Sequence, residues 1–381
     1  MIRRKPKSAA VKIAVVTAVT ALVVIALVAL ALILLHKPWL DDDVPWTSVQ
    51  PEGTKAPGSE INDPSDPKYV RDQNLTNFLV LGRDRVANLT DVIMVIRFNT
   101  SDHSVSIMQI PRDTYSVYGS SYHKINGLFS YGMVQNDYKI KDAMESTVDF
   151  IQQNLNIKID YYVLMNLDAL VDVVDAIGGV EVDVPSDMFY EDPDQDLLID
   201  LKAGLQTLSG KQAEGFVRFR SGYIEADAGR VDAQKIFLSA FAKQFKEKVS
   251  ISNIDSLVTT AYKNITTNMS MSDIIYYAKE ARSVDVAKAK FISLPYGDAR
   301  EDVNSGQWYV ILNRKATLDA INKYFNVYDK DVDDATFDAA RAFTNVNKAH
   351  INEHYIAEGL SAKVTTMENV IDEGIDIPTK K

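Results

Sequence analysis

Acidic side chains stand where two predicted strands meet their turns, and they are the first candidates for chemistry. Asp84 follows the apolar run Asn77–Leu81, and Asp91 opens the β-branched run Asp91–Phe98. In open α/β sheets, ligands bind where strands end. Two carboxylates on neighbouring strand ends would share a hard cation such as Mg²⁺, which takes oxygen ligands and keeps several waters. Turn residues and a cap are the simpler interpretation of the same pair.

A second candidate set is basic and amidic, and its members are Arg112, Arg218, Arg220, Arg230 and Gln234. Arg112 follows the proline that ends a strand-like run. Arg230 and Gln234 are four residues apart, so they share one face of a predicted helix. A guanidinium fork binds phosphate through paired hydrogen bonds. The set therefore indicates an anion site if it converges, and ordinary surface salt bridges if it does not.

Several other chemistries are disfavoured by the residues that the sequence lacks. It has no cysteine, which excludes disulfides, thiolate metal sites and cysteine nucleophiles. The five histidines show no arrangement typical of a Ser-His-Asp triad, and they are His36, His103, His123, His350 and His354. Neither a phosphate-binding Walker loop nor a dinucleotide fingerprint occurs.

Alternating strands and helices are predicted to position the candidate residues. The strands are 77–81, 91–98, 104–110, 158–164, 180–184 and 289–294. The helices are 142–155, 167–177, 210–220, 229–249, two within 251–285, and 316–324. This order predicts an α/β fold with a mixed central β-sheet flanked by helices on both faces. We expect strand 289–294 to complete the sheet and residues 187–196 to form an acidic loop.

An apolar stretch near the N-terminus predicts a transmembrane helix. Residues 13–35 are interrupted only by Thr17 and Thr20. At about 1.5 Å per residue, the stretch spans the ~30 Å hydrocarbon layer. It exceeds the roughly 7–15 residues of a signal peptide's apolar core, so we expect an anchor rather than a cleaved signal. Five basic residues precede it, which predicts a cytoplasmic N-terminus and a folded bulk outside the membrane.

Composition divides the chain into five parts. We predict a cytoplasmic basic arm (1–12), a transmembrane helix (13–35), a flexible extracytoplasmic linker (37–70), one large domain (72–328), and a charged helix with a mobile tail (329–381). Without the arm, 36 Lys and Arg face 52 Asp and Glu, a formal charge of −16. Nucleic acid is therefore not an expected partner.

The motifs that surround these residues resemble the LytR-CpsA-Psr family of Gram-positive cell envelopes. Seven blocks occur in the family's order, and they are residues 77–84, 90–94, 110–114, 124–126, 166–185, 208–213, and 217–220 with 227–230 and Gln234. The resemblance covers residues 75 to 245, and the family's domain usually continues to the stretch that ends near 328.

The resemblance implies a membrane-anchored phosphotransferase that moves a glycopolymer from a polyprenyl-pyrophosphate carrier to peptidoglycan through a phosphodiester bond. It leaves the polymer open, whether wall teichoic acid, capsule or another glycan. Asp84 and Asp91 would be Mg²⁺-associated acids, and Arg112, Arg218 and Arg220 would join them in catalysis. The implied pyrophosphate-binding set is Arg112, Lys124, Arg218, Arg220, Arg230 and Gln234.

Two other functions fit the same residues. A non-catalytic envelope-anchored binder of polyprenyl-linked glycan would use the arginines but not the acid pair. A polyprenyl-pyrophosphate pyrophosphatase would differ only in taking water as the acceptor. Direct regulation of transcription is disfavoured, because a cytoplasmic part of about a dozen residues is too short for a DNA-binding domain.

Overall fold

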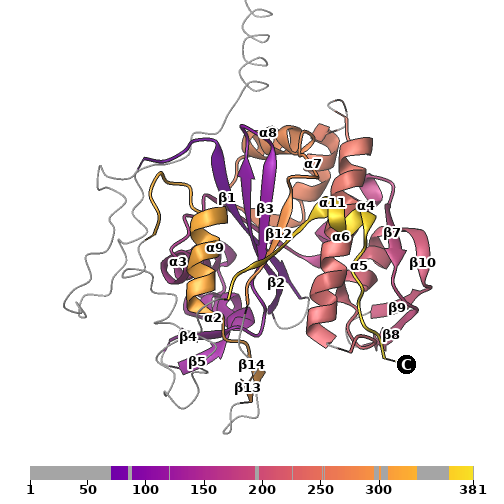
Figure 1. Ribbon diagram of the computed structural model, residues 1–381, viewed down its shortest axis with the longest axis horizontal. Coiled ribbons are helices and arrows are strands. Elements are labelled where there is room, and N and C mark those ends of the chain that lie inside the picture. Colours follow the sequence, from indigo (N-terminus) through magenta and orange to yellow (C-terminus); the bar gives the residue numbers. More distant parts are fainter. Residues whose placement is uncertain are drawn as a thin grey trace, which may run out of the picture.

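The computed structural model (Figure 1) describes residues 70–84, 88–119, 121–193, 197–224, 226–250, 252, 254–295, 300–301, 308–332 and 360–380. The predicted basic arm, the transmembrane helix and all of the linker except Val70 lie outside these residues. Within the described ranges, no helix combines the length and the apolar character that crossing a membrane requires.

A seven-stranded mixed sheet forms the centre of the molecule. Its strands, in spatial order, are β11 (Ile265–Thr267), β6 (Tyr161–Met165), β1 (Leu75–Arg83), β2 (Thr90–Asn99), β3 (Ser104–Gln109), β12 (Lys290–Ser293) and β15 (Lys363–Thr366). β1 is parallel to β6 and β3 is parallel to β12, while the other neighbours are antiparallel. The predictions of a mixed sheet and of a late strand that joins it are confirmed.

The sheet topology brings several chain segments to one edge. β1, β3, β6 and β12 run in the same direction, because β1 and β3 are both antiparallel to β2. Their carboxyl ends therefore meet beside the amino end of β2. We call this side of the sheet the carboxyl edge, and it is where an open α/β sheet places its ligand crevice.

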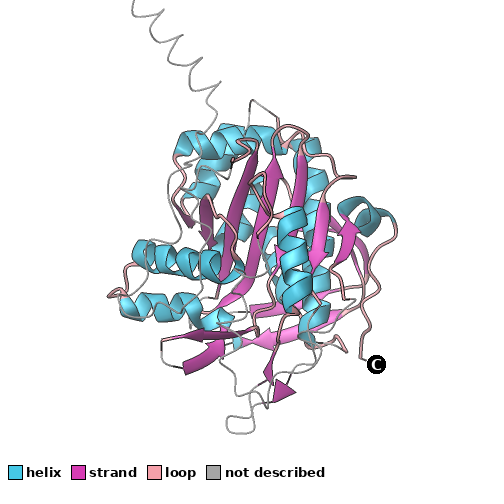
Figure 2. Cartoon of the chain, turned by 60° about the vertical axis from the view of Figure 1, so that its left-hand side comes forward, coloured by secondary structure: helices cyan, strands magenta, loops and turns pink. Residues whose placement is uncertain are grey.

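Helices cover both faces of the sheet, as Figure 2 shows. On the first face lie α2 (Leu128–Gln135), α3 (Ile140–Leu155) and α9 (Arg314–Tyr324). On the second face lie α4 (Leu167–Ala176), α5 (Gly210–Arg218), α6 (Ala226–Lys248), α7 (Ile254–Tyr262), α8 (Met271–Ala281) and α11 (Met367–Asp372). The predicted three-layer arrangement of helices, sheet and helices is thus present.

Local sequence explains where two helices of the second face begin. Ser209 caps α5, and Gln212 returns a hydrogen bond to the Ser209 backbone, which completes a capping box. The Asn166 side chain accepts from the Ala169 N–H and so caps α4. These caps start the helices immediately after strands, so the chain turns back over the sheet without a long loop.

Short antiparallel pairs extend the molecule beyond the central sheet. They are β4 (Tyr115–Tyr118) with β5 (Ser121–Lys124), β7 (Val180–Val184) with β10 (Gly204–Leu208), β8 (Met188–Asp192) with β9 (Leu197–Leu201), and β13 (Arg300–Glu301) with β14 (Trp308–Tyr309). A 3₁₀ turn, η1 (Ile125–Gly127), follows β5.

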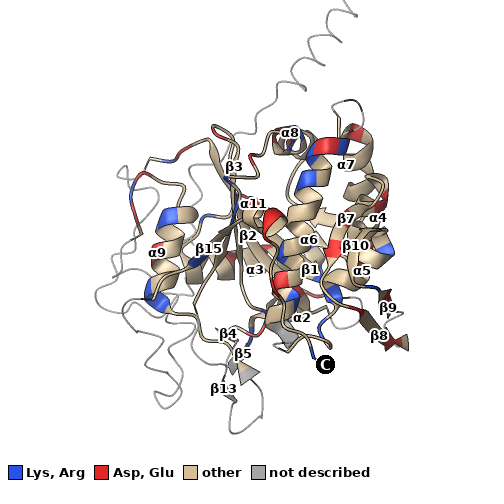
Figure 3. Ribbon diagram, turned by 45° about the vertical axis from the view of Figure 1, so that its right-hand side comes forward, with Lys and Arg blue, Asp and Glu red and all other residues tan. Residues whose placement is uncertain are grey.

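Two of these pairs differ from the expectations. The segment expected to form an acidic loop, 187–196, contains β8, which pairs with β9, and the acidic residues Glu191 and Asp192 lie on β8 (Figure 3). β7 was predicted as a strand but pairs only with β10, outside the central sheet. The reason is its strict alternation of buried Val and exposed acid, which suits a strand with one face in water.

The C-terminal part departs from the predicted mobile tail. Residues 360–380 contain β15, which extends the central sheet beside β12, and α11, which packs on α6. Met367, Val370 and Ile377 are buried apolar anchors, and they are separated by charged and polar residues. The sparse anchors explain why the composition suggested a tail, whereas pairing with the edge of the sheet fixes this segment in place.

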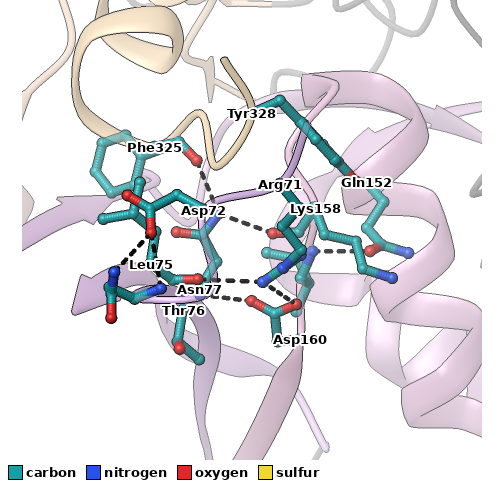
Figure 4. A network of polar contacts seen from close by, with 12 residues as sticks. Arg71, Asp72, Leu75, Thr76, Asn77, Gln152, Lys158, Asp160, Phe325 and Tyr328 are labelled. Carbon is teal, nitrogen blue, oxygen red and sulfur yellow. Dashed lines mark hydrogen bonds and ion pairs between the residues drawn. The ribbon is translucent and has the colours of Figure 1, made fainter. Parts of the chain in front are cut away.

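A buried ion pair fastens the start of the described chain to the sheet (Figure 4). Arg71 Nη2 lies 2.8 Å from Asp160 Oδ1, and both side chains are almost fully buried. The Asn77 N–H donates to Asp160 Oδ2 at 2.8 Å, and the Asn77 amide donates to the carbonyls of Lys158 and Phe325. Burial raises the pKa of the Asp160 carboxyl, and the Arg71 charge opposes that shift. The network joins the entry of β1 to the entry of β6 and to the end of α9.

The Arg71–Asp160 pair yields a stability prediction. Asp160→Asn keeps the shape of the side chain but leaves the buried Arg71 charge without its counter-ion, so we expect the free energy of unfolding to fall by about 3–5 kcal/mol. Urea denaturation of the purified protein measures the change. The control is Asp319→Asn, which removes an exposed pair with Lys315 on α9 and should cost less than about 1 kcal/mol. Equal effects of the two substitutions would contradict a stabilising role for the buried pair.

Candidate functional site

The two predicted acids flank the last residue pair of the β1–β2 ladder at the carboxyl edge. Arg83 pairs with Thr90, so Asp84 and Asp91 are each one residue from this last pair of the β1–β2 ladder. The register shifts between Gly82 and Arg83, which leaves Asp91 as the extra residue of a β-bulge. A bulge re-aims the side chain it carries. The Asp84 carboxylate also accepts from the Leu89 N–H at 3.2 Å, which closes the connecting turn.

Alternating charges connect β2 to the segments that follow β3. Arg112 Nη1 lies 2.7 Å from Asp91 Oδ1, and Lys124 Nζ lies 3.0 Å from Asp113 Oδ1. Arg112 Nε also faces Asp113, at 3.9 Å. All four side chains are partly exposed. The predicted acid Asp91 and the predicted cations Arg112 and Lys124 therefore belong to one accessible row of charges.

A chain of amide hydrogen bonds ties this row to the second group of arginines. Gln109, the last residue of β3, donates to Gln234 Oε1 at 2.7 Å. Gln234 Nε2 in turn donates to the Val217 carbonyl at 3.0 Å. Val217 immediately precedes Arg218 at the end of α5. Both ends of the Gln234 amide thus hold β3, α5 and α6 together, a role that its spacing from Arg230 did not indicate.

Arg218 is held by a buried acid that sequence reasoning missed. Glu214 is 2% exposed, with Oε1 at 2.9 Å from Arg218 Nη1 and Oε2 at 3.0 Å from Lys211 Nζ. Glu214 and Arg218 are four residues apart in α5, and this spacing was the only sequence signal that could have indicated the pair. A buried carboxylate that engages two cations therefore fixes the position of the Arg218 guanidinium beside the last turn of α5.

The remaining cations of the set come from the two segments after α5. Arg220 is exposed just beyond the end of α5, whereas Arg230 is buried in the first turns of α6. Lys235, next to Gln234, was not among the predicted residues. Its Nζ contacts Asp232 at 2.8 Å and the Ser293 hydroxyl at 3.2 Å, which brings it to the carboxyl end of β12.

The two faces of the sheet differ in how completely their apolar side chains are buried. On the first face, Leu79, Leu81, Ile93 and Val95 are at most 1% exposed. On the second face, Val80, Val92 and Ile96 remain half-buried. The facing helices also carry half-buried apolar side chains, and these include Leu170 of α4, Leu238 and Phe241 of α6, and Ile274 of α8. An incompletely buried apolar layer therefore lies between the second face of the sheet and its helices.

The acid pair fits a cation that is shared with a ligand better than one caged by protein. Within the described residues, no three His, Asp or Glu side chains converge as a metal site. Asp84 and Asp91 offer two carboxylates at adjacent strand ends. Mg²⁺ commonly binds through one or two carboxylates and fills its shell with water and phosphate oxygens. These two acids would therefore hold the ion if a phosphate ligand completed its coordination.

Comparison with known proteins identifies the same family that the sequence motifs resemble. The LytR_cpsA_psr family model matches residues 47–326. The chain is 28% identical over 252 residues to TagU of Bacillus mycoides, a polyisoprenyl-teichoic acid–peptidoglycan teichoic acid transferase, covering 65% of this chain and 77% of TagU. It is 30% identical over 189 residues to the Bacillus subtilis transferase TagV, covering 48% of this chain. The chain spans between 46% and 58% of the length of two of its relatives.

A solved structure shares the fold. TagT bound to LI-WTA is 26% identical, with a TM-score of 0.54, and the match covers 66% of this chain and 89% of that one. The central sheet with its flanking helices is thus common to both molecules.

Pyrophosphate titration tests whether the arginines form one anion site. A hydrogen bond to a charged group contributes about 1.5–3 kcal/mol, so Arg112→Ala and Arg218→Ala should each weaken binding of inorganic pyrophosphate roughly tenfold to a hundredfold. Isothermal titration calorimetry measures the affinity. Lys288→Ala is the control, because Lys288 is an exposed cation before the amino end of β12, on the opposite side of the sheet. If all three variants bind pyrophosphate equally well, the arginines do not form the site.

Proposed function

The chain belongs to the LytR-CpsA-Psr family, and we propose that it is a phosphotransferase that moves a glycopolymer from a polyprenyl-pyrophosphate carrier to peptidoglycan. The observation that carries the proposal is the row of cations and acids at the carboxyl edge, next to a half-buried apolar layer. A lipid pyrophosphate needs both features, because its headgroup is anionic and its chain is apolar. The polyisoprenyl-teichoic acid–peptidoglycan transferase activities of TagU and TagV, and the LI-WTA bound to TagT, support a polyisoprenyl-linked polymer as donor.

The proposed reaction is a single displacement at phosphorus. The oxygen of an acceptor sugar hydroxyl forms a bond to the phosphorus nearest the glycan, and the bond from that phosphorus to the bridging oxygen breaks. The bridging oxygen leaves with the polyprenyl phosphate, and the hydroxyl proton passes to a carboxylate, Asp84 or Asp91. Phosphoryl transfer depends mainly on positioning and charge stabilisation, so the reaction does not require a histidine base.

The cations have distinct parts in this proposal. Arg112, Arg218 and Arg220 would bind the non-bridging oxygens and stabilise the charge that develops on the leaving phosphate. Arg230 and Lys124 would fix the outer ends of the pyrophosphate. Gln234 would position Arg218 rather than bind phosphate, because its amide already joins β3 to the end of α5. Glu214 would hold Arg218 in the orientation for binding.

Mg²⁺ is part of the proposal through Asp84 and Asp91. When bound, it would neutralise phosphate charge and polarise the phosphorus for attack. Asp91 pairs with Arg112 in this structure, so both groups are already held where phosphate oxygens would enter. The same contact means that substitution of Asp91 affects the position of Arg112 as well as the cation.

The cellular placement follows from the sequence. We propose that residues 13–35 anchor the chain in the cell membrane as a single span, with the N-terminus cytoplasmic and the domain on the envelope side. Residues 37–70 would form the linker between the membrane and the domain. The anchor and the lipid of the donor would lie in the same membrane, so the domain would meet the donor headgroup at the membrane surface.

A coupled transfer assay tests the activity. We expect purified protein, a short polyprenyl-pyrophosphate glycan and a peptidoglycan fragment to yield polyprenyl phosphate and glycan joined to the acceptor. Asp91→Asn and Arg218→Ala should each lower the rate at least about a hundredfold, since each removes stabilisation worth several kcal/mol in the transition state. Chelation of divalent cations should lower the rate as well. Chromatography with mass spectrometry measures both products, and Lys288→Ala serves as the control.

The products separate the alternatives. Release of polyprenyl phosphate with no glycan on the acceptor would identify a pyrophosphatase. Donor binding with no product across a panel of glycans would identify a non-catalytic binder. Either result would overturn the proposal that the protein is a transferase.

A further inference from the structure

We propose that the C-terminal residues 375–380, here called the strap, position the loop that joins the two arginine-bearing helices. This loop comprises residues 219–224, between the end of α5 and the start of α6. In this proposal, which rests on the proposed function, the backbone carbonyl of Pro378 and the backbone N–H of Lys380 are the groups that position the loop for pyrophosphate binding. They would act by holding the backbone that carries Arg220.

Three hydrogen bonds join the strap to the loop. The Ile224 N–H donates to the Pro378 carbonyl at 2.9 Å, and the Lys380 N–H donates to the Gly222 carbonyl at 2.7 Å. The Lys380 ammonium adds a bond to the Ser221 carbonyl at 2.9 Å. Tyr223 and Thr379 face one another as an antiparallel bridge between the two backbone bonds. The chain end thus forms a short two-stranded ladder with the loop.

The other side of the loop is packed into the core. Tyr223 is fully buried, and its ring meets Phe219 edge-on, with centroids 5.3 Å apart. Gly229 lies against Tyr223 so closely that an added Cβ would stand 2.6 Å from the Tyr223 Cβ. Ile377 of the strap is buried in the same cluster. The loop is therefore held between the core on one side and the strap on the other.

The position of the loop matters because arginines of the proposed anion site lie at both of its ends. Arg218 and Arg220 come immediately before its central turn, and Arg230 comes six residues after Ile224 in α6. Arg220 is exposed and lies beyond the last helical residue of α5, so no helix fixes its backbone. The strap bonds the next residues, Ser221 and Gly222, and so limits where Arg220 can lie.

The strap follows two elements, β15 and α11, that are attached to the domain independently of the loop. β15 pairs with β12 at the edge of the central sheet, and α11 packs on α6 through buried Met367 and Val370. This segment lies beyond the residues 47–326 that match the family model. The strap therefore connects elements that are attached to the central sheet with the loop that leads into α6.

The test compares variants that differ in a single backbone donor. Lys380→Pro removes the N–H that bonds Gly222, whereas Lys380→Ala keeps that donor and loses only the ammonium. A third variant ends after Gly374 and lacks the whole strap. For each, hydrogen–deuterium exchange of residues 219–224 reports the order of the loop. Calorimetry reports affinity for inorganic pyrophosphate, and the transfer assay gives KM and kcat.

We expect Lys380→Pro and the shortened chain to exchange faster in the loop and to bind pyrophosphate about three- to tenfold more weakly, because the competent loop conformation is then only partly populated. KM for the donor should rise by a similar factor while the melting temperature of Lys380→Pro stays close to that of the unmodified protein. Lys380→Ala should stay within about twofold of the unmodified protein, since its lost bond is solvent-exposed.

The inference would be overturned if hydrogen–deuterium exchange of residues 219–224 is unchanged in Lys380→Pro. It would also be overturned if this exchange is faster but the pyrophosphate affinity and KM are unchanged. If the unmodified protein transfers no glycan, the proposed reaction fails, while the exchange and pyrophosphate measurements still decide whether the strap positions the loop. If the shortened chain does not fold, Lys380→Pro alone decides the outcome.

Discussion

The hydrogen-bonded register of β1, β2 and β3 is the constraint on which the candidate site depends. It sets β1 and β3 in the same direction and places the bulge at Asp91 beside the last pair of the β1–β2 ladder. The end of β3 can then bring Arg112 to Asp91 and Gln109 to Gln234. A shift of one residue in this register would turn the apolar side chains of a strand to the opposite face. The completely buried first face therefore holds the site in register.

Three cations of the candidate site, Arg112, Lys124 and Arg218, are each held by an acid, which has an electrostatic consequence for a chain of net charge −11. Asp91 faces Arg112, Asp113 faces Lys124, and buried Glu214 faces Arg218. These acids keep the cations oriented, but they also oppose the positive potential that would attract an anion. Glu214 differs from the other two acids because it is buried and lies behind Arg218 in α5. In the proposed function, Arg218 would therefore bind a phosphate without losing its partner.

Much of the fold could be predicted from the sequence because its central elements are strongly patterned. The runs that became β1, β2 and β3 are apolar and β-branched, and α4 and α5 carry polar caps. Tertiary context decided the rest. The alternation of Val and acid in Val180–Val184 suits a strand with one face in water, but it does not show that the partner is β10. β15 is a short, polar strand that forms beside β12. Within the site, residue types indicated the cations and acids, while the bridging role of Gln234 and the buried Glu214 depend on contacts between helices and strands that spacing does not show.

The buried Arg71–Asp160 pair also has a mechanical consequence. A force transmitted through the chain before Val70 would first reach the hydrogen bonds between Val70 and Asp329 and then the Arg71–Asp160 pair. Beyond it, β1 is bonded on both sides, to β2 and to β6, so a pull along its axis would load two ladders of hydrogen bonds in shear rather than open them one at a time. Shear of many bonds at once resists extension far better than sequential peeling. The carboxyl edge lies at the far end of the same strand, so the whole length of β1 separates the point of tension from the acids and arginines.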